Sequence, residues 1–137
     1  MLLMGKNRSV ESLRFLVVDD HEKFRELVIQ FLELGDDQYR ECSNGREALE
    51  ACQEEIPDCI LMDLEMPVMD GMTAVKVISA DYPEVKVIML SQHDHPDLPP
   101  AARRNGAFAY LTKDNLNELS QCIQSAVTDG TDNPASS

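Results

Sequence analysis

Residues 13–20 have the sequence Leu-Arg-Phe-Leu-Val-Val-Asp-Asp, a short apolar run that ends in two aspartates. Apolar and β-branched runs of about four to eight residues are typical of strands that are buried on both faces. Residues 59–63 (Cys-Ile-Leu-Met-Asp) repeat this pattern, and residues 85–91 (Val-Lys-Val-Ile-Met-Leu-Ser) repeat it with a serine at the end. We therefore expect these three segments to be the central strands of a sheet.

Amphipathic helical patterns separate the predicted strands. In residues 24–32 apolar side chains recur at positions i, i+3, i+4 and i+7, which places them on one face of a helix. Asn44 with Glu47, and Asn115 with Glu118, resemble capping boxes, so we expect a helix to begin at each pair. The other predicted elements are a weaker strand at residues 39–42, a helix at about residues 73–80 and a fifth strand at residues 107–111.

Strand and helix alternate five times with short connections, and this alternation determines the predicted architecture. Such a pattern requires parallel strands, right-handed crossovers and helices on both faces of one sheet. We predict an α/β fold with a doubly wound, five-stranded parallel sheet in the order 2-1-3-4-5, with the half-polar strand 39–42 at an edge. Pro99 and Pro100 stand where the fourth helix should lie, and proline inside a helix costs about 3 kcal/mol. We therefore expect a shortened fourth helix that begins near these prolines.

The chain is short and strongly acidic, with 137 residues and a formal net charge of −13. This length suits a single domain, and the negative charge disfavours direct nucleic acid binding by this domain and attraction to anionic lipids. No apolar run approaches the roughly 20 residues that span a bilayer, and the apolar start at residues 1–4 is too short for a signal peptide. We therefore expect a cytoplasmic protein that does not bind membranes.

Composition divides the chain into three parts. We expect residues 1–11 to be a flexible leader, residues 12–127 to form the folded domain, and the small, polar residues 128–137 to be a disordered tail or the stub of a linker. The four cysteines are irregularly spaced and form no CxxC motif, so we expect them to be reduced and buried. They are Cys42, Cys52, Cys59 and Cys122.

Polar side chains follow four of the predicted strands at the point where each strand ends. They are Asp19 and Asp20, Asp63, Ser91 and, shortly after the fifth strand, Lys113. The carboxyl ends of parallel strands form the binding crevice of an open sheet, so these side chains should meet there. Three crowded carboxylates repel one another and raise a carboxyl pKa, and a Mg²⁺ ion would relieve this repulsion.

This set of groups suits phosphoryl transfer. Lys113 and the Ser91 hydroxyl can bind the oxygens of a transferring phosphoryl group, and Asp63 is the expected nucleophile because a carboxylate can form an acyl phosphate. Each residue alone has a simpler explanation as a helix cap, a turn residue or a solvated surface group. Their appearance in order at successive strand ends favours the functional interpretation.

Four segments resemble the receiver domain of two-component response regulators. They are FLVVDDH (residues 15–21), CILMDLEMPVMDG (59–71), VIMLSQHDHPDL (87–98) and GAFAYLTKD (106–114). The resemblance extends from about Leu13 to Val127 and is closest to receivers that carry a C-terminal helix-turn-helix output domain. It implies a flavodoxin-like fold and a phosphorylation-activated signalling switch. Such a switch is not an enzyme, and its chemistry is limited to self-catalysed phosphoryl acceptance and autodephosphorylation.

The resemblance also implies the metal and phosphoryl site. Asp63 would accept a phosphoryl group from a phosphohistidine on a sensor histidine kinase or a phosphotransfer protein. Asp20, Asp63 and the backbone carbonyl of Glu65 would bind Mg²⁺ directly, and Asp19 would bind it through a water molecule. Ser91 would then bond a phosphoryl oxygen.

The same resemblance implies how the signal leaves the site. Lys113 would pair with the phosphate, and Tyr110 matches a switch aromatic whose ring turns inward as Ser91 moves toward the phosphoryl group. The surface formed by the fourth helix, the fifth strand and the fifth helix would change and regulate a downstream protein or a fused output domain. A stand-alone receiver and the N-terminal domain of a longer regulator are both open, as is a phosphorylation-dependent dimer.

Some residues depart from the receiver pattern. Asp114 follows Lys113 where many receivers have a proline, although the related helix-turn-helix receivers often do not. Glu65 and His93 occupy two positions that tune the lifetime of the phosphoryl group in the family. The loop at residues 93–95 (His-Asp-His) has no third ligand at a suitable spacing, so we expect it to be solvated and to bind no metal.

Two other functions on the same architecture fit the sequence less well. A Mg²⁺-dependent phosphohydrolase with an aspartyl nucleophile would need a second aspartate where Glu65 stands, and the chain has no room for a substrate-specificity cap. A flavodoxin-like FMN carrier would need a Ser/Thr/Gly-rich phosphate loop after the first strand and aromatic residues beside the flavin. Residues 19–22 are instead Asp-Asp-His-Glu, and the chain has no Trp.

Overall fold

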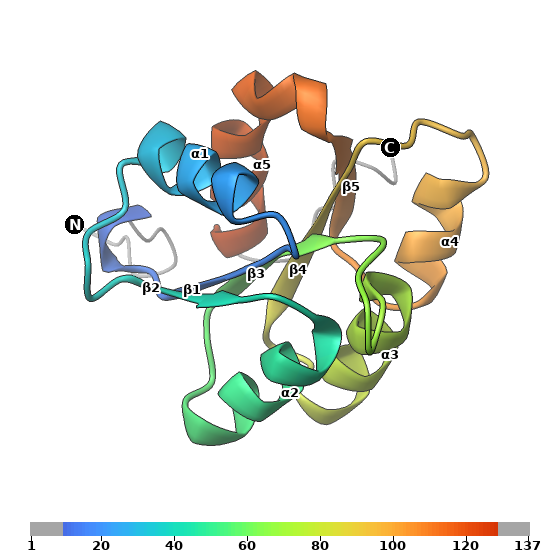
Figure 1. The fold of residues 1–137 in the computed structure, drawn as a ribbon, viewed down its shortest axis with the longest axis horizontal. Coiled ribbons are helices and arrows are strands. Elements are labelled where there is room, and N and C mark those ends of the chain that lie inside the picture. Colours follow the sequence, from blue (N-terminus) through green and yellow to red (C-terminus); the bar gives the residue numbers. More distant parts are fainter. Residues whose placement is uncertain (1–9, 129–137) are drawn as a thin grey trace.

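Five parallel strands form one sheet in the order β2-β1-β3-β4-β5 in the computed structural model, which describes residues 10–128 (Figure 1). The strands are β1 (Phe15–Val18), β2 (Tyr39–Cys42), β3 (Cys59–Asp63), β4 (Lys86–Ser91) and β5 (Ala109–Thr112). The predicted fold class and strand order are therefore confirmed. The boundaries differ slightly, since β5 begins at Ala109 and not at Ala107.

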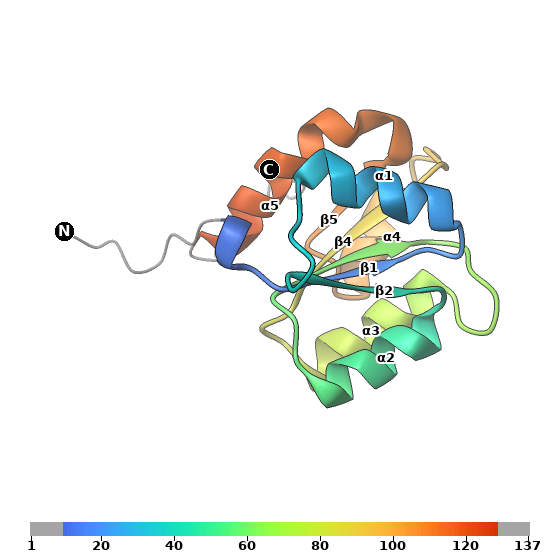
Figure 2. The same cartoon turned by 60° about the vertical axis from the view of Figure 1, so that its left-hand side comes forward.

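Helices cover both faces of the sheet, with α1 and α5 on one face and α2 and α3 on the other (Figure 2). The helices are α1 (Glu22–Leu32), α2 (Gly45–Glu54), α3 (Gly71–Asp81), α4 (Leu98–Arg104) and α5 (Leu119–Val127). Two 3₁₀ segments, η1 (Val10–Ser12) and η2 (Lys113–Glu118), precede β1 and α5. This arrangement leaves the carboxyl ends of all five strands at one edge of the sheet, since the strands are parallel.

The central strands β1 and β3 are buried along their whole length because helices cover both of their faces. Successive side chains point to opposite sides. Leu16 and Ile60 join a core cluster with α2, α3 and α4, while Phe15 and Leu61 join a second cluster with α1 and α5. Each such side chain contributes about 1.5–3 kcal/mol by leaving water, so these apolar runs supply much of the folding free energy.

The capping box predicted at the start of α2 is present. The Asn44 Oδ1 accepts a hydrogen bond of 2.9 Å from the Glu47 N–H. In return, the Glu47 carboxylate accepts a hydrogen bond of 2.7 Å from the N–H of Ser43, one residue before the usual partner. The local sequence therefore determines where this helix begins.

The capping box predicted at Asn115 and Glu118 is wrong. Asn115 lies inside η2 with non-helical backbone angles (φ −115°, ψ 42°), and its side-chain amide donates a hydrogen bond of 3.1 Å to Thr112 Oγ1. The α-helix begins only at Leu119, without a side-chain cap. The Asn115 side chain is used to hold the end of β5, so it is not available to cap a helix.

The fourth helix is short, as predicted, with 7 residues. Pro99 and Pro100 lie in its first turn, where backbone N–H groups have no partner within the helix and a missing N–H costs little. The preceding segment, residues 92–97, is a loop that leads away from the end of β4. The fourth helix therefore starts well after its strand.

The predicted leader and tail lie almost wholly outside the described residues. Within them, η1 closes the start of the domain, because the Val10 carbonyl accepts hydrogen bonds from the Leu13 N–H (3.1 Å) and the Gln38 side-chain amide (2.5 Å). None of the helices in residues 10–128 has both the length and the apolar character that crossing a bilayer requires. All four cysteines are free and buried, and burial raises the pKa of their thiols.

Candidate functional site

Three carboxylates lie together at the edge of the sheet where β1 and β3 end. Asp19 and Asp20 directly follow β1, and Asp63 is the last residue of the neighbouring strand β3. Asp19 and Asp63 are buried, while Asp20 is exposed. One oxygen from each of these carboxylates and one ring nitrogen of His21 all lie within 4.8 Å of one another, so the group could hold a metal ion.

Lys113 brings positive charge to these carboxylates. It follows β5 directly, and its Nζ lies 2.7 Å from Asp19 Oδ2 and 3.3 Å from Asp63 Oδ1. The Lys113 side chain is only 14% exposed, so solvent screens these ion pairs weakly. The Nζ also lies 4.3 Å from the centre of the Phe24 ring, close enough for a cation–π attraction. The ammonium group is thus confined between two acids and an aromatic ring.

The environment of Asp63 disfavours its charge. Burial and the neighbouring Asp19 charge raise the pKa of Asp63 to about 6, and Lys113 offsets only part of this rise. Lys113 supplies one positive charge against the three carboxylates and pairs with two of them, and Asp19 Oδ2 accepts no hydrogen bond within residues 10–128 although it is ion-paired. Carboxylate oxygens are the ligands that Mg²⁺ prefers, so this donor set fits the metal that the resemblance implies.

Close packing at Gly71 holds the backbone next to Asp63. A Cβ on Gly71 would overlap the Asp63 carbonyl oxygen, so a larger residue would push the start of α3 away from the end of β3. The Gly71 N–H donates a hydrogen bond of 2.8 Å to the Leu64 carbonyl. Asp70 caps α3, and its carboxylate accepts a hydrogen bond of 2.8 Å from the Thr73 N–H. The Asp70-Gly71 pair therefore has a structural role at this site.

The predicted switch residues lie further along the sheet and meet at the loop after β4. Ser91, the last residue of β4, is buried, and its Oγ accepts a hydrogen bond of 3.1 Å from the His93 N–H. Tyr110 on β5 is also buried, and its hydroxyl donates a hydrogen bond of 2.6 Å to the His93 carbonyl. Burial raises the pKa of Tyr110, so this hydroxyl stays protonated and keeps its donor role.

Glu65 and His93, singled out separately in the sequence, contact each other. The His93 Nε2 lies 2.9 Å from Glu65 Oε1, and both side chains are substantially exposed. This contact joins the loop after β3 to the loop after β4. Glu65 follows Asp63 by two residues, so the Glu65–His93 contact lies beside the candidate site. Sequence reasoning did not predict it, because neither residue belongs to a periodic pattern.

Sequence reasoning also missed three contributions from the start of α1. His21 Nδ1 lies 3.2 Å from both Asp19 Oδ1 and Asp20 Oδ1. The Arg25 guanidinium donates a hydrogen bond of 2.6 Å to the Asp19 carbonyl and one of 2.7 Å to Glu41 on β2. Together with Phe24 against Lys113, these contacts come from positions i, i+3 and i+4. Helical spacing alone could have placed them on one side of the helix.

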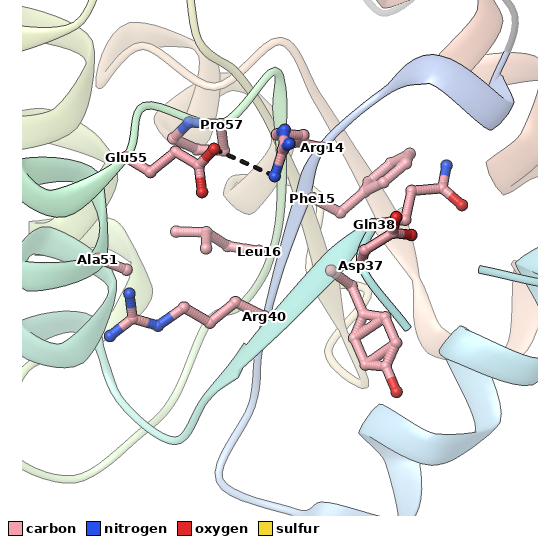
Figure 3. A pocket seen from close by; sticks show the side chains of 10 residues that line it. Arg14, Phe15, Leu16, Asp37, Gln38, Arg40, Ala51, Glu55 and Pro57 are labelled. Carbon is pink, nitrogen blue, oxygen red and sulfur yellow. Dashed lines mark ion pairs between the residues drawn. The ribbon is translucent and has the colours of Figure 1, made fainter. Parts of the chain in front are cut away.

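A small cleft of about 60 Å³ lies at the opposite end of β1 and β2, between these strands and α2 (Figure 3). Arg14 reaches across it and pairs with Glu55 at 3.1 Å, and Arg40 pairs with Glu54 at 2.6 Å. Both arginines therefore already have acidic partners. No residue of the candidate site lines this cleft.

Comparison with known proteins agrees with this fold. The response regulator receiver domain family matches residues 15–124. The chain therefore belongs to the response regulator receiver domain family. The receiver domain of the response regulator NarL from Mycobacterium tuberculosis superposes with a TM-score of 0.75 at 31% identity, over 85% of this chain and 97% of that chain. The response regulator domain of Thermotoga maritima CheB superposes with a TM-score of 0.74 at 31% identity, over 84% of this chain and 96% of that chain.

The curated relatives are longer regulators. The chain is 36% identical over 104 residues to the transcriptional regulatory protein LnrK of Bacillus subtilis, which covers 74% of this chain and 47% of LnrK. It is 34% identical over 111 residues to the probable transcriptional regulatory protein NarL of M. tuberculosis, with coverage of 80% and 51%. The chain thus spans about half the length of the curated relatives it matches. These relatives are transcriptional regulatory proteins, which agrees with the helix-turn-helix output subfamily that the resemblance indicated.

Proposed function

We propose that Asp63 accepts a phosphoryl group from a phosphohistidine on a sensor histidine kinase or phosphotransfer protein, in a Mg²⁺-dependent reaction. The observation that carries this proposal is the position of the Asp63 carboxylate at the carboxyl end of β3. It is buried beside Asp19 and lies 3.3 Å from the Lys113 ammonium group. Membership of the receiver family supports it.

The chemistry follows from these side chains. An Asp63 oxygen attacks phosphorus, an O–P bond forms, and the P–N bond breaks as the donor imidazole leaves with the electron pair and takes up a proton. Lys113 lies where it can neutralise charge on the phosphoryl oxygens. Asp20, Asp63 and the Glu65 carbonyl, with Asp19 through water, would hold Mg²⁺, which supplies further positive charge toward the transferring group. In autodephosphorylation, water attacks phosphorus, which releases inorganic phosphate and restores the Asp63 carboxylate.

The hydrogen bonds of His93 suggest how this event changes the surface. The phosphoryl group would draw the Ser91 hydroxyl toward itself, and Ser91 Oγ would then release the His93 N–H that it now accepts from. Tyr110 is bonded to the His93 carbonyl, so displacement of this loop reaches β5 and the start of α4. The α4–β5–α5 surface would then regulate a downstream protein or a fused output domain. The shift in population is set by the difference in phosphoryl contacts between the two states.

This proposal places the chain in the cytoplasm and assigns it no nucleic acid or membrane ligand of its own, in line with its net charge of −13. A dimer that forms on phosphorylation is one form that the regulated contact could take. If the chain takes part in transcriptional regulation, as the names of the longer relatives indicate for those proteins, contact with DNA would be made by a partner or by a fused domain.

Intact-mass spectrometry after treatment with acetyl phosphate and Mg²⁺ tests the proposal. We expect one added phosphoryl group on the wild-type chain and none on Asp63→Asn, while the control Asp81→Asn, an exposed carboxylate at the end of α3, behaves as wild type. Excess EDTA should abolish the addition. No added mass on the wild type, under conditions where a known receiver reacts, would contradict the assignment, as would equal modification of Asp63→Asn.

A further inference from the structure

We propose that His21 supplies a nitrogen ligand to a cation held by Asp19, Asp20 and Asp63, so that this site selects Zn²⁺ over Mg²⁺ more strongly than its carboxylates alone would. The inference rests on the proposed function, because it concerns the same acidic site. It adds a ligand, a competing metal and a form of regulation, since bound Zn²⁺ would exclude the Mg²⁺ that phosphoryl transfer needs.

The distances suit shared coordination. His21 Nδ1 lies 3.2 Å from Asp19 Oδ1 and 3.2 Å from Asp20 Oδ1. Ligand bonds to Zn²⁺ are about 2.0–2.2 Å, which places neighbouring ligand atoms about 3–3.5 Å apart around the ion. The Asp63 carboxylate belongs to the same group of atoms, within 4.8 Å of the others. The exposed His21 and Asp20 side chains can rotate to shorten the longest of these separations.

The buried acid gives an independent reason to expect a cation. Asp19 is 2% exposed, and within residues 10–128 its Oδ2 accepts no hydrogen bond, although Lys113 Nζ lies 2.7 Å away. The single positive charge of Lys113 pairs with Asp19 and Asp63 but leaves the group of three carboxylates with a net negative charge. A divalent cation held by these side chains would offset that charge.

The backbone at His21 explains why its ring faces the acids. His21 is the N-cap residue of α1, with extended angles (φ −101°, ψ 107°), yet its side chain makes no capping hydrogen bond. Its N–H donates a hydrogen bond of 2.9 Å to Asp19 Oδ1, and this bond turns the residue back toward the end of β1. The imidazole therefore serves the acidic site and does not cap the helix.

The chemistry of the ligand determines the metal. Imidazole nitrogen binds Zn²⁺ and the later first-row metals well, while Mg²⁺ keeps to oxygen ligands and its own water molecules. Removing His21 should therefore weaken Zn²⁺ binding and leave Mg²⁺ binding nearly unchanged. A His21 that merely pairs with two carboxylates would not distinguish the two ions.

Titration calorimetry on the 137-residue chain, with Zn²⁺ and Mg²⁺ in separate experiments at fixed pH, tests the proposal. We expect His21→Ala to raise the Zn²⁺ dissociation constant by about tenfold or more, with less than about a twofold change for Mg²⁺. The control His95→Ala, an exposed histidine in the loop after β4, should change neither constant. His21→Asn, which is a better helix cap than alanine, guards against a folding defect and should show the same loss.

A spectroscopic measurement makes the test independent of phosphorylation. The ring ¹⁵N resonances of His21 should shift on addition of Zn²⁺ and stay in place on addition of Mg²⁺. Unchanged Zn²⁺ affinity in His21→Ala, or equal weakening for both ions, would overturn the proposal. Phosphoryl acceptance by Asp63 in Mg²⁺ is measured separately by mass, so a failure of the proposed function would be recognised as distinct from a failure of the zinc site.

Discussion

The Tyr110 hydroxyl donates a 2.6 Å hydrogen bond to the backbone carbonyl of His93, and this bond ties the edge strand β5 to the loop after β4. The other backbone group of His93, its N–H, donates to the Ser91 hydroxyl at 3.1 Å. One loop residue is therefore held by both of the residues to which the sequence assigned a switching role. A displacement of Ser91 would therefore break a hydrogen bond to the same loop residue that Tyr110 holds.

Tyr110→Phe should destabilise the domain by about 1 kcal/mol, because it removes this hydrogen bond but keeps the buried ring. Hydrogen exchange of the amides in residues 92–97 should speed up at the same time. Urea unfolding and exchange mass spectrometry measure the two effects. The control is Tyr82→Phe, whose hydroxyl makes no hydrogen bond within the described residues, and it should change neither quantity. An unchanged exchange rate in Tyr110→Phe would show that the bond does not hold the loop.

Lys113→Met should cost about 3 kcal/mol of unfolding free energy at pH 7.5 in EDTA, since it leaves two buried carboxylates without their ammonium partner. It should also raise the pKa of Asp63 further, because the Lys113 charge lowers that pKa. The loss of stability should therefore shrink as the pH falls through that pKa and Asp63 becomes neutral. Lys76→Met, on the exposed side of α3, serves as the control. A loss that is independent of pH would point to lost packing instead of lost charge compensation.

Asp63→Asn should stabilise the metal-free domain by about 3 kcal/mol at pH 7.5. The pKa of Asp63 is raised to about 6 in the folded state, above its ordinary value of 3.8, so the folded protein binds this proton more tightly than the unfolded chain does. Stability from this group is thus present below about pH 4 and is lost as the pH rises through 6. Urea unfolding of wild type and variant from pH 4 to pH 8 checks this. The two curves should converge at low pH, and a constant difference would refute the argument.

Val68→Gly should stabilise the domain by about 1 kcal/mol. Val68 has φ 70°, a left-handed conformation that is costly for a β-branched residue, and the hydrogen bond from the Met69 N–H to the Pro67 carbonyl (2.7 Å) closes a tight turn around it. Its side chain is 75% exposed, so little packing is lost with it. The unfolding temperature of Val68→Ala should lie between those of the wild type and Val68→Gly, because alanine removes the branched side chain but keeps Cβ. A less stable Val68→Gly would mean that the turn is not strained.

Some of the site could be predicted from the sequence because parallel strands impose a common edge. The two aspartates after β1, the aspartate ending β3 and the lysine after β5 follow strands of one parallel sheet, so their side chains come together however the helices pack. The short length of α4 could also be predicted, because proline restricts the backbone locally. The capping box at Asn44 is equally local.

The sequence alone thus determined the alternation of strand and helix, the parallel sheet with a half-polar edge strand and the edge at which the acids gather. Only the tertiary structure decided which side chains face those acids. The approach of His21 to two carboxylates and the pairing of Glu65 with His93 depend on loop backbone angles and rotamers. The hydrogen bond from Asn115 to Thr112, which the side chain makes instead of capping a helix, depends on the same factors. Hydrophobic periodicity records burial along helices and strands, but loop contacts bury little apolar surface, so no periodic pattern in the sequence records them.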